Sequence, residues 1–134
     1  MTIRTILVDD EKLAIQGLQL RLEPFEDVEI IGTCANGREA IRKIKTEKPD
    51  LVFLDIQMPE MDGFGVLETL APEELPVVIF VTAFDQYAVQ AFEVHALDYL
   101  LKPFDDDRFQ EAVNRAKATL RAREVEKVSE NWWG

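Results

Sequence analysis

An apolar run that ends in one carboxylate is the feature of this 134-residue sequence that most limits its fold. Residues 51–54 read Leu-Val-Phe-Leu, and Asp55 follows directly. A short apolar run bounded by turn residues is typical of a strand buried on both faces. Such strands occur in parallel sheets covered by helices, where ligands bind beyond the carboxyl ends of the strands. Taken alone, an Asp after a strand more often caps the next turn than takes part in chemistry.

Strand-like and helix-like patterns alternate along the whole chain. A segment with helical spacing follows each strand pattern, and Asn36 with Glu39 predicts a capping box at the second of these helices. Asp85 is expected to cap the fourth helix, and the acidic run 105–107 to open the fifth. Five β-α units at short spacing predict an α/β fold with a doubly wound parallel sheet. The expected strands are residues 3–8, 28–33, 51–55, 77–82 and 97–101.

The charge balance excludes one class of partner for this segment. The formal net charge is −11, with 26 acidic against 15 basic residues, and such a surface repels a phosphate backbone. We therefore expect no direct nucleic acid binding. The single cysteine, Cys34, cannot form an internal disulfide, which favours a reducing compartment. No signal-peptide pattern opens the sequence and no apolar run approaches the roughly 20 residues of a membrane span, so we expect a cytoplasmic protein without membrane contact.

Polar residues that can carry chemistry stand at the end of four of the five expected strands. Because parallel strands place their carboxyl ends at one edge of the sheet, we expect these residues to converge there. Three carboxylates in one place repel one another, and a hard divalent cation such as Mg²⁺ compensates them economically. A lysine adds positive charge from the opposite side, and a threonine offers a hydroxyl donor. The residues are Asp9, Asp10, Asp55, Thr82 and Lys102.

This set predicts phosphoryl transfer to a carboxylate. An aspartate nucleophile can form an aspartyl-phosphate, while a metal ion and a lysine neutralise the charge that develops on the phosphoryl oxygens. Each residue alone has a simpler explanation: Asp10 as a helix cap, Thr82 as a strand residue, Lys102 as a surface charge. Five such residues at strand ends in one β-α series favour the functional interpretation.

Four groups of motifs contain these residues: Val8-Asp9-Asp10-Glu11, Leu54-Asp55 with Met58-Pro59 and Met61-Asp62-Gly63, Thr82-Ala83, and Lys102-Pro103-Phe104. With these motifs the sequence resembles the receiver domain of two-component response regulators over about residues 3 to 120. This resemblance implies a flavodoxin-like (βα)5 fold with strand order 2-1-3-4-5 and phosphorylation by a histidine kinase.

The resemblance also implies a role for each site residue. Asp55 is the phosphoacceptor, and Thr82 and Lys102 contact the phosphoryl group. Thr82 and Tyr99 form the switch, in which Thr82 moves toward the phosphoryl group and Tyr99 turns inward. Side chains at the positions of Gln57 and Phe84 influence how water reaches the phosphoryl group. The implied Mg²⁺ ligands are Asp10, Asp55 and the Gln57 backbone carbonyl, with Asp9 acting through water; the Lys102-Pro103 bond is expected to be cis.

Residues 82–92 and 96–103 resemble more particularly the LytR/AlgR class, which usually joins its receiver to a C-terminal LytTR DNA-binding domain. We expect residues 1–121 to form the receiver domain, with a packed last helix that ends near Leu120. Residues 122–134 are expected to be a helix extension or linker truncated before an output domain. Trp132 and Trp133 then stand in a linker; a functional aromatic patch is the alternative.

The fourth helix is expected to present the output surface. Its apolar residues cover a broad arc, so we predict homodimerisation on phosphorylation through a face formed by the fourth helix, the fifth strand and the fifth helix. The apolar residues are Tyr87, Ala88, Ala91, Phe92 and Val94.

Two other functions remain open. A standalone single-domain receiver that docks onto a partner protein is the main alternative. A Mg²⁺-dependent phosphatase with an Asp nucleophile is less favoured, because such enzymes commonly carry a second acid where this chain has Gln57. We therefore expect a signalling domain that catalyses only its own phosphorylation and dephosphorylation.

Overall fold

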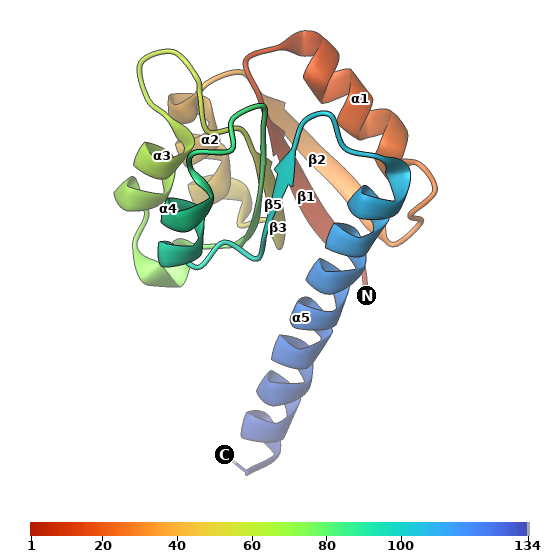
Figure 1. Cartoon of the computed structure of the whole chain (residues 1–134). Helices are drawn as coiled ribbons and strands as arrows, with labels where there is room; N and C mark the ends of the chain where they lie inside the picture. The colour runs from red at the N-terminus through yellow and green to blue at the C-terminus, as the bar shows by residue number, and fades with distance from the viewer. Residues whose placement is uncertain (134) are drawn as a thin grey trace.

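Five parallel strands form one sheet in the order β2-β1-β3-β4-β5 (Figure 1). The computed structural model describes the backbone of residues 1–133 and the side chains of residues 1–127. This order confirms the predicted doubly wound flavodoxin-like sheet. The strands are β1 (Ile3–Val8), β2 (Val28–Cys34), β3 (Leu51–Leu54), β4 (Val77–Thr82) and β5 (Asp98–Leu101).

Helices cover both faces of this sheet. On one face, Phe53 and Leu7 pack with residues of α1 and α5; on the other, Val52 and Ile6 pack with residues of α2, α3 and α4. Successive residues of a strand point to opposite faces, so the uninterrupted apolar runs of β3 and β4 supply both layers of the core. The helices are α1 (Lys12–Leu22), α2 (Gly37–Glu47), α3 (Gly63–Thr69), α4 (Ala88–Glu93) and α5 (Asp106–Trp133), with a 3-10 turn η1 (Pro72–Glu74).

The ends of the helices follow local chemistry, with one correction. The Asn36 side chain accepts a hydrogen bond from the Glu39 backbone N–H, as the capping box predicts, but the Glu39 side chain accepts from the Ala35 N–H and not from that of Asn36. The prediction that Asp85 caps α4 is wrong: Tyr87 occupies the N-cap position and the helix begins at Ala88. Residues 85–87 instead form a bend and a turn, which makes α4 short and lengthens the loop after β4.

Helix α5 continues beyond the body of the domain (Figure 1). Its packed stripe ends at Leu120, and residues 121–127 are all exposed. The division at residue 121 into a receiver domain and an extension stays a prediction. The side chains of Trp132 and Trp133 lie outside the described residues. Within the described part of the chain, no helix is both long and apolar enough to cross a membrane.

Gly63 allows the loop after β3 to fold back against the end of that strand. Its backbone N–H donates to the Ile56 carbonyl over 2.8 Å. A Cβ atom at this position would lie 2.6 Å from the Asp55 carbonyl oxygen, a distance that two such atoms do not tolerate. Because Gly63 has no side chain, the loop can lie directly against the backbone of Asp55 and Ile56.

We predict that Gly63→Ala destabilises the protein by about 1–3 kcal/mol, the usual cost of forcing an extra methyl group into a packed site. Gly17→Ala is the matched control, because a Cβ there meets only the Arg21 side chain, at 3.8 Å, within a helix that alanine favours. Urea unfolding of both variants gives the comparison. Equal stability of Gly63→Ala and wild type would contradict the close approach.

Candidate functional site

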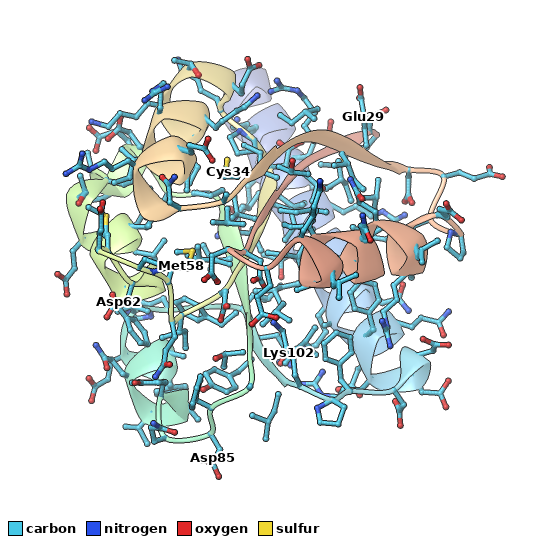
Figure 2. All side chains as sticks on the ribbon, turned by 90° about the horizontal axis from the view of Figure 1, so that it is seen from above. Glu29, Cys34, Met58, Asp62, Asp85 and Lys102 are labelled. Atoms are coloured by element: carbon cyan, nitrogen blue, oxygen red, sulfur yellow. The ribbon has the colours of Figure 1, made fainter. Side chains whose placement is uncertain are left out.

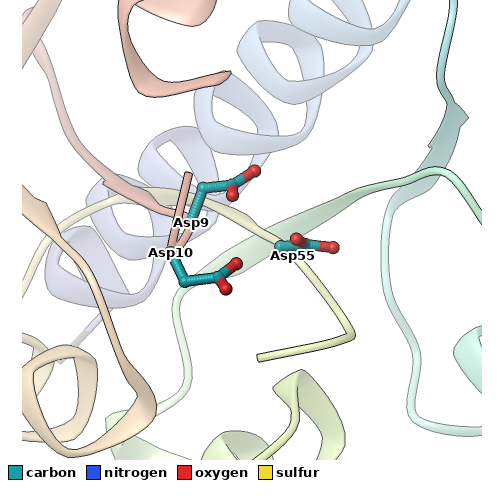
Figure 3. A group of neighbouring side chains, drawn as sticks. All are labelled: Asp9, Asp10 and Asp55. Atoms are coloured by element: carbon teal, nitrogen blue, oxygen red, sulfur yellow. The ribbon is translucent and has the colours of Figure 1, made fainter. Parts of the chain in front are cut away.

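Three carboxylates converge at the carboxyl edge of the sheet. Asp9 and Asp10 follow β1, Asp55 follows β3, and each offers an oxygen within 4.8 Å of the others (Figure 3). Asp9 and Asp55 are buried, whereas Asp10 is exposed. The neighbouring strands hold the three in place, because the Asp55 N–H donates to the Val8 carbonyl. The predicted convergence of these three residues is what the structure shows.

Lys102 supplies the positive charge at this edge, which Figure 2 views from above. Its Nζ atom lies 2.9 Å from Asp9 Oδ2, and the other Asp9 oxygen accepts the Glu11 backbone N–H at 2.9 Å. The Lys102-Pro103 bond is cis, as expected. The lysine thus neutralises Asp9 rather than Asp55, which sequence reasoning did not predict.

The Asp55 carboxyl is left in an unfavourable environment for its charged form. Burial, and then the negative charge of Asp9, raise the pKa of Asp55 to about 6, and the nearby charge of Lys102 only partly opposes this. A buried carboxylate beside another carboxylate is a group that gains from a cation. This arrangement fits the oxygen-rich site that Mg²⁺ prefers, in which one or two carboxylates bind the ion together with water.

Thr82 and Tyr99 lie on the neighbouring strands. Thr82 is the last residue of β4 and fully buried, and its hydroxyl accepts the Phe84 backbone N–H at 3.4 Å, so its own proton remains free to be donated. The Tyr99 hydroxyl donates to the Phe84 carbonyl. Burial raises the pKa of this hydroxyl, which keeps it a donor at neutral pH. Both predicted switch residues therefore contact the same loop.

One contact at this edge was missed by sequence reasoning. The Gln57 side chain donates from Nε2 to the Tyr87 hydroxyl over 2.9 Å. The resemblance drew attention to the Gln57 position, but no pattern in one sequence relates it to a tyrosine thirty residues later. The role of the Gln57 backbone carbonyl as a metal ligand stays a prediction.

The whole site lies within a segment that matches a known family. Residues 5–114 match the model of the response regulator receiver domain. The transcriptional regulatory protein BtsR of Salmonella typhi is 43% identical over 129 residues, which cover 96% of this chain and 54% of that protein. An uncharacterized response regulatory protein of Vibrio cholerae is 49% identical over 113 residues, covering 84% of this chain and 48% of its own length.

Solved structures agree with these sequence matches. The receiver domain of AraT, a response regulator from Geobacillus stearothermophilus, superimposes with a TM-score of 0.82 at 31% identity, covering 92% of this chain and 99% of that structure. The response regulatory domain of mrkE from Klebsiella pneumoniae gives a TM-score of 0.77 at 33% identity, with 91% and 98% covered. The chain therefore spans nearly all of these single domains but about half the length of the curated relatives.

We predict that Asp55→Asn stabilises the metal-free protein at neutral pH. The folded-state pKa of Asp55 lies above its unfolded value, so its contribution to stability is complete below about pH 4 and is lost as the pH rises through 6. Thermal unfolding in EDTA should show the variant more stable than wild type at pH 7.5, by on the order of 1–3 kcal/mol. Near pH 4 the two should be equal.

The control for this prediction is Asp85→Asn, which removes one charge from an exposed position in the loop after β4, outside the acidic cluster. It should change stability little at either pH. A wild-type protein as stable as Asp55→Asn at pH 7.5 without metal would show that burial and the neighbouring carboxylates do not disfavour the charged form of Asp55.

Proposed function

The chain belongs to the receiver domains of two-component response regulators, and we propose that it accepts a phosphoryl group from a histidine kinase on Asp55 with Mg²⁺ bound. The observation that carries this proposal is the carboxylate cluster at the edge of the sheet, in which Asp55 has a raised pKa and follows the central strand. The receiver is a signalling domain, and the only chemistry we propose for it is its own phosphorylation and dephosphorylation.

The proposed metal ligands are Asp10, Asp55 and the Gln57 backbone carbonyl, with Asp9 acting through water. When bound, Mg²⁺ supplies positive charge that lowers the repulsion among the carboxylates and offsets charge on phosphoryl oxygens. The chain contributes the fixed geometry: β1 and β3 hold the carboxylates within 4.8 Å of one another before any ligand arrives.

The proposed transfer uses Asp55 as the nucleophile. One carboxylate oxygen of Asp55 forms a bond to the phosphorus of the kinase phosphohistidine, whose other ring nitrogen is protonated; the phosphorus–nitrogen bond breaks, its electron pair stays on that nitrogen, and the ring leaves as neutral imidazole. Lys102 exchanges its contact with Asp9 for the phosphoryl oxygens, and the free proton of Thr82 is donated to one of them. Positioning and charge account for the rate, because phosphoryl transfer needs little covalent help from the protein.

We propose that Thr82 and Tyr99 carry the signal away from the site. Phosphorylation adds a doubly charged group with strong acceptor oxygens, which draws the Thr82 hydroxyl toward it. The Phe84 backbone is hydrogen-bonded to both side chains. Movement of Thr82 therefore shifts Phe84, and with it the hydrogen bond to Tyr99 and the loop that leads to α4. A local electrostatic change is thereby passed to a surface.

For the whole protein we propose transcription regulation in the cytoplasm through an output domain outside this segment. The support is that BtsR is called a transcriptional regulatory protein and has about twice the length of this chain. A LytTR-type DNA-binding domain is our candidate for that output, since the net charge of −11 disfavours DNA contact by the receiver. A standalone receiver that docks onto a partner is the alternative, and sequence beyond Gly134 in the gene would separate the two.

The proposal is tested by incubation with acetyl phosphate and Mg²⁺ followed by intact mass measurement. Wild type should gain the mass of one phosphoryl group, and omission of Mg²⁺ should prevent most of the gain. Asp55→Asn should gain none, because the nucleophile is lost, whereas Asp85→Asn should behave as wild type. An Asp55→Asn protein that takes up the same phosphate would overturn the assignment.

The proposed dimer face is built from α4, β5 and α5. Val89 is 72% exposed and Phe92 is 83% exposed, while Ala91 turns into the core. Of the predicted apolar arc, Ala91 is thus buried and Phe92 is exposed, and Val89 joins Phe92 on the exposed side. Single exposed apolar residues are common, but two on one short helix favour an interaction surface.

Ion pairs make the rest of this face rigid. Arg108 of α5 binds Asp98 of β5 through both terminal nitrogens, at 2.6 and 3.0 Å, and Arg115 adds a contact at 3.2 Å. Although burial opposes it, hydrogen bonding to Arg108 holds the pKa of Asp98 below its ordinary value. A face whose parts are already fixed loses less entropy when it binds a second copy.

We predict that Phe92→Glu prevents dimerisation of the activated protein. Wild type treated with beryllofluoride and Mg²⁺ should sediment as a dimer, whereas the variant should bind at least tenfold more weakly, because burial of two Phe side chains is replaced by like charges. Leu20→Glu, a change at an exposed position of α1, is the control and should still dimerise. Beryllofluoride-treated wild type that stays monomeric at high concentration would contradict the proposed dimerisation.

A further inference from the structure

A side-chain hydrogen bond connects the two loops that follow the central strands. Gln57 belongs to the loop after β3, and Tyr87 ends the loop after β4. Gln57 Nε2 donates to the Tyr87 hydroxyl over 2.9 Å. The Gln57 side chain is exposed, so this bridge lies on the solvent side of the sheet edge.

The Tyr87 hydroxyl is a fixed acceptor. Its ring is half-buried and packs against Phe64, with centroids 6.1 Å apart, and edge-on against Phe84, at 6.4 Å. Phe64 is itself buried and packs on Phe80 of β4. The Tyr87 carbonyl accepts the Ala91 N–H in the first turn of α4. The phenol oxygen is therefore held by both the core and the helix, and the flexible partner in this bond is Gln57.

The position of the bridge relative to the proposed phosphorylation site follows from the sheet. Strands β3 and β4 are paired neighbours; Asp55 follows the first and Thr82 ends the second. Gln57 and Tyr87 belong to the loops that continue these same strands. The hydrogen bond between the two loops therefore lies beyond the ends of the strands that carry Asp55 and Thr82, at the sheet edge where the phosphoryl group would bind.

We propose that Tyr87 is a positioning residue that holds the Gln57 side chain over the phosphorylated Asp55 and so slows loss of the phosphoryl group. The inference rests on the proposed function. In the loss reaction a water oxygen forms a bond to phosphorus, the bond from phosphorus to the Asp55 oxygen breaks, and the products are the Asp55 carboxylate and inorganic phosphate, which keeps the water protons. Gln57 tied to Tyr87 blocks the solvent side, whereas free Gln57 leaves it open to water.

The same bond connects phosphate lifetime to the output helix. Tyr87 is the N-cap residue of α4, so any partner that moves the start of α4 moves the acceptor of the Gln57 hydrogen bond. A protein bound at α4 therefore changes how long the signal persists, without touching Asp55.

The test measures phosphate loss from four proteins: wild type, Tyr87→Phe, Gln57→Met and the double variant. Each is phosphorylated with acetyl phosphate and Mg²⁺, separated from the donor by desalting, and followed by intact mass. Tyr87→Phe keeps the aromatic packing and removes only the acceptor; Gln57→Met keeps the length of the side chain and removes the donor. Gln86→Ala, an exposed change in the same loop, is the matched control.

Each single variant should lose phosphate about three- to tenfold faster than wild type, the size expected for one hydrogen bond. The double variant should be no faster than either single variant, because both remove the same bond. In the unphosphorylated protein, the side-chain amide resonances of Gln57 should shift in Tyr87→Phe and stay unchanged in Gln86→Ala. Thermal unfolding shows whether each variant keeps the stability of wild type, and Gln57→Met tests the bridge with a change that lies outside α4.

The outcomes separate this inference from the proposed function. Wild type that takes up no phosphate overturns both. Phosphate uptake with an unchanged rate of loss in Tyr87→Phe, or a double variant whose acceleration is the product of the two single effects, overturns only the role of Tyr87.

Discussion

Mutual repulsion of three carboxylates is the interaction on which the site depends. A fold that placed Asp9, Asp10 and Asp55 apart would be more stable without ligand, yet β1 and β3 hold them within 4.8 Å of one another. Lys102 compensates one of them, and burial, together with the charge of Asp9, leaves Asp55 with a raised pKa. The core on both faces of the sheet stabilises this arrangement, and a cation or a phosphoryl group changes its energy directly.

Much of this could be predicted because parallel sheets leave a strong signature in sequence. Apolar runs without alternation show that both faces of β3 and β4 are covered, and the polar residues at the strand ends must then meet at one edge. These apolar runs alone are enough to predict the position of Asp55 at the edge of the sheet. The family resemblance added roles to residues whose positions the strand pattern had already fixed.

What could not be predicted depends on contacts between loops. Lys102 was expected near the carboxylates, but its choice of Asp9 as partner depends on distances that no spacing encodes. The start of α4 was misplaced because aspartate is a common N-cap residue, whereas the helix begins only at Ala88, after a turn in which Tyr87 packs on Phe64. The importance of Gly63 is likewise visible only when the Asp55 carbonyl is seen 2.6 Å from where a side chain would begin.

Because α5 is long, a small tilt of this helix displaces its far end by a larger distance. The helix is anchored along the sheet as far as Leu120, and the stretch to Trp133 adds roughly 20 Å at about 1.5 Å per residue. A tilt of about 5° at the anchored base, within the usual scale of helix shifts between signalling states, would displace the far end of such a rod by nearly 2 Å. Asp98 binds the packed part of this helix through Arg108 and Arg115. For a given tilt, the displacement of the far end is therefore set by the length of helix beyond Leu120.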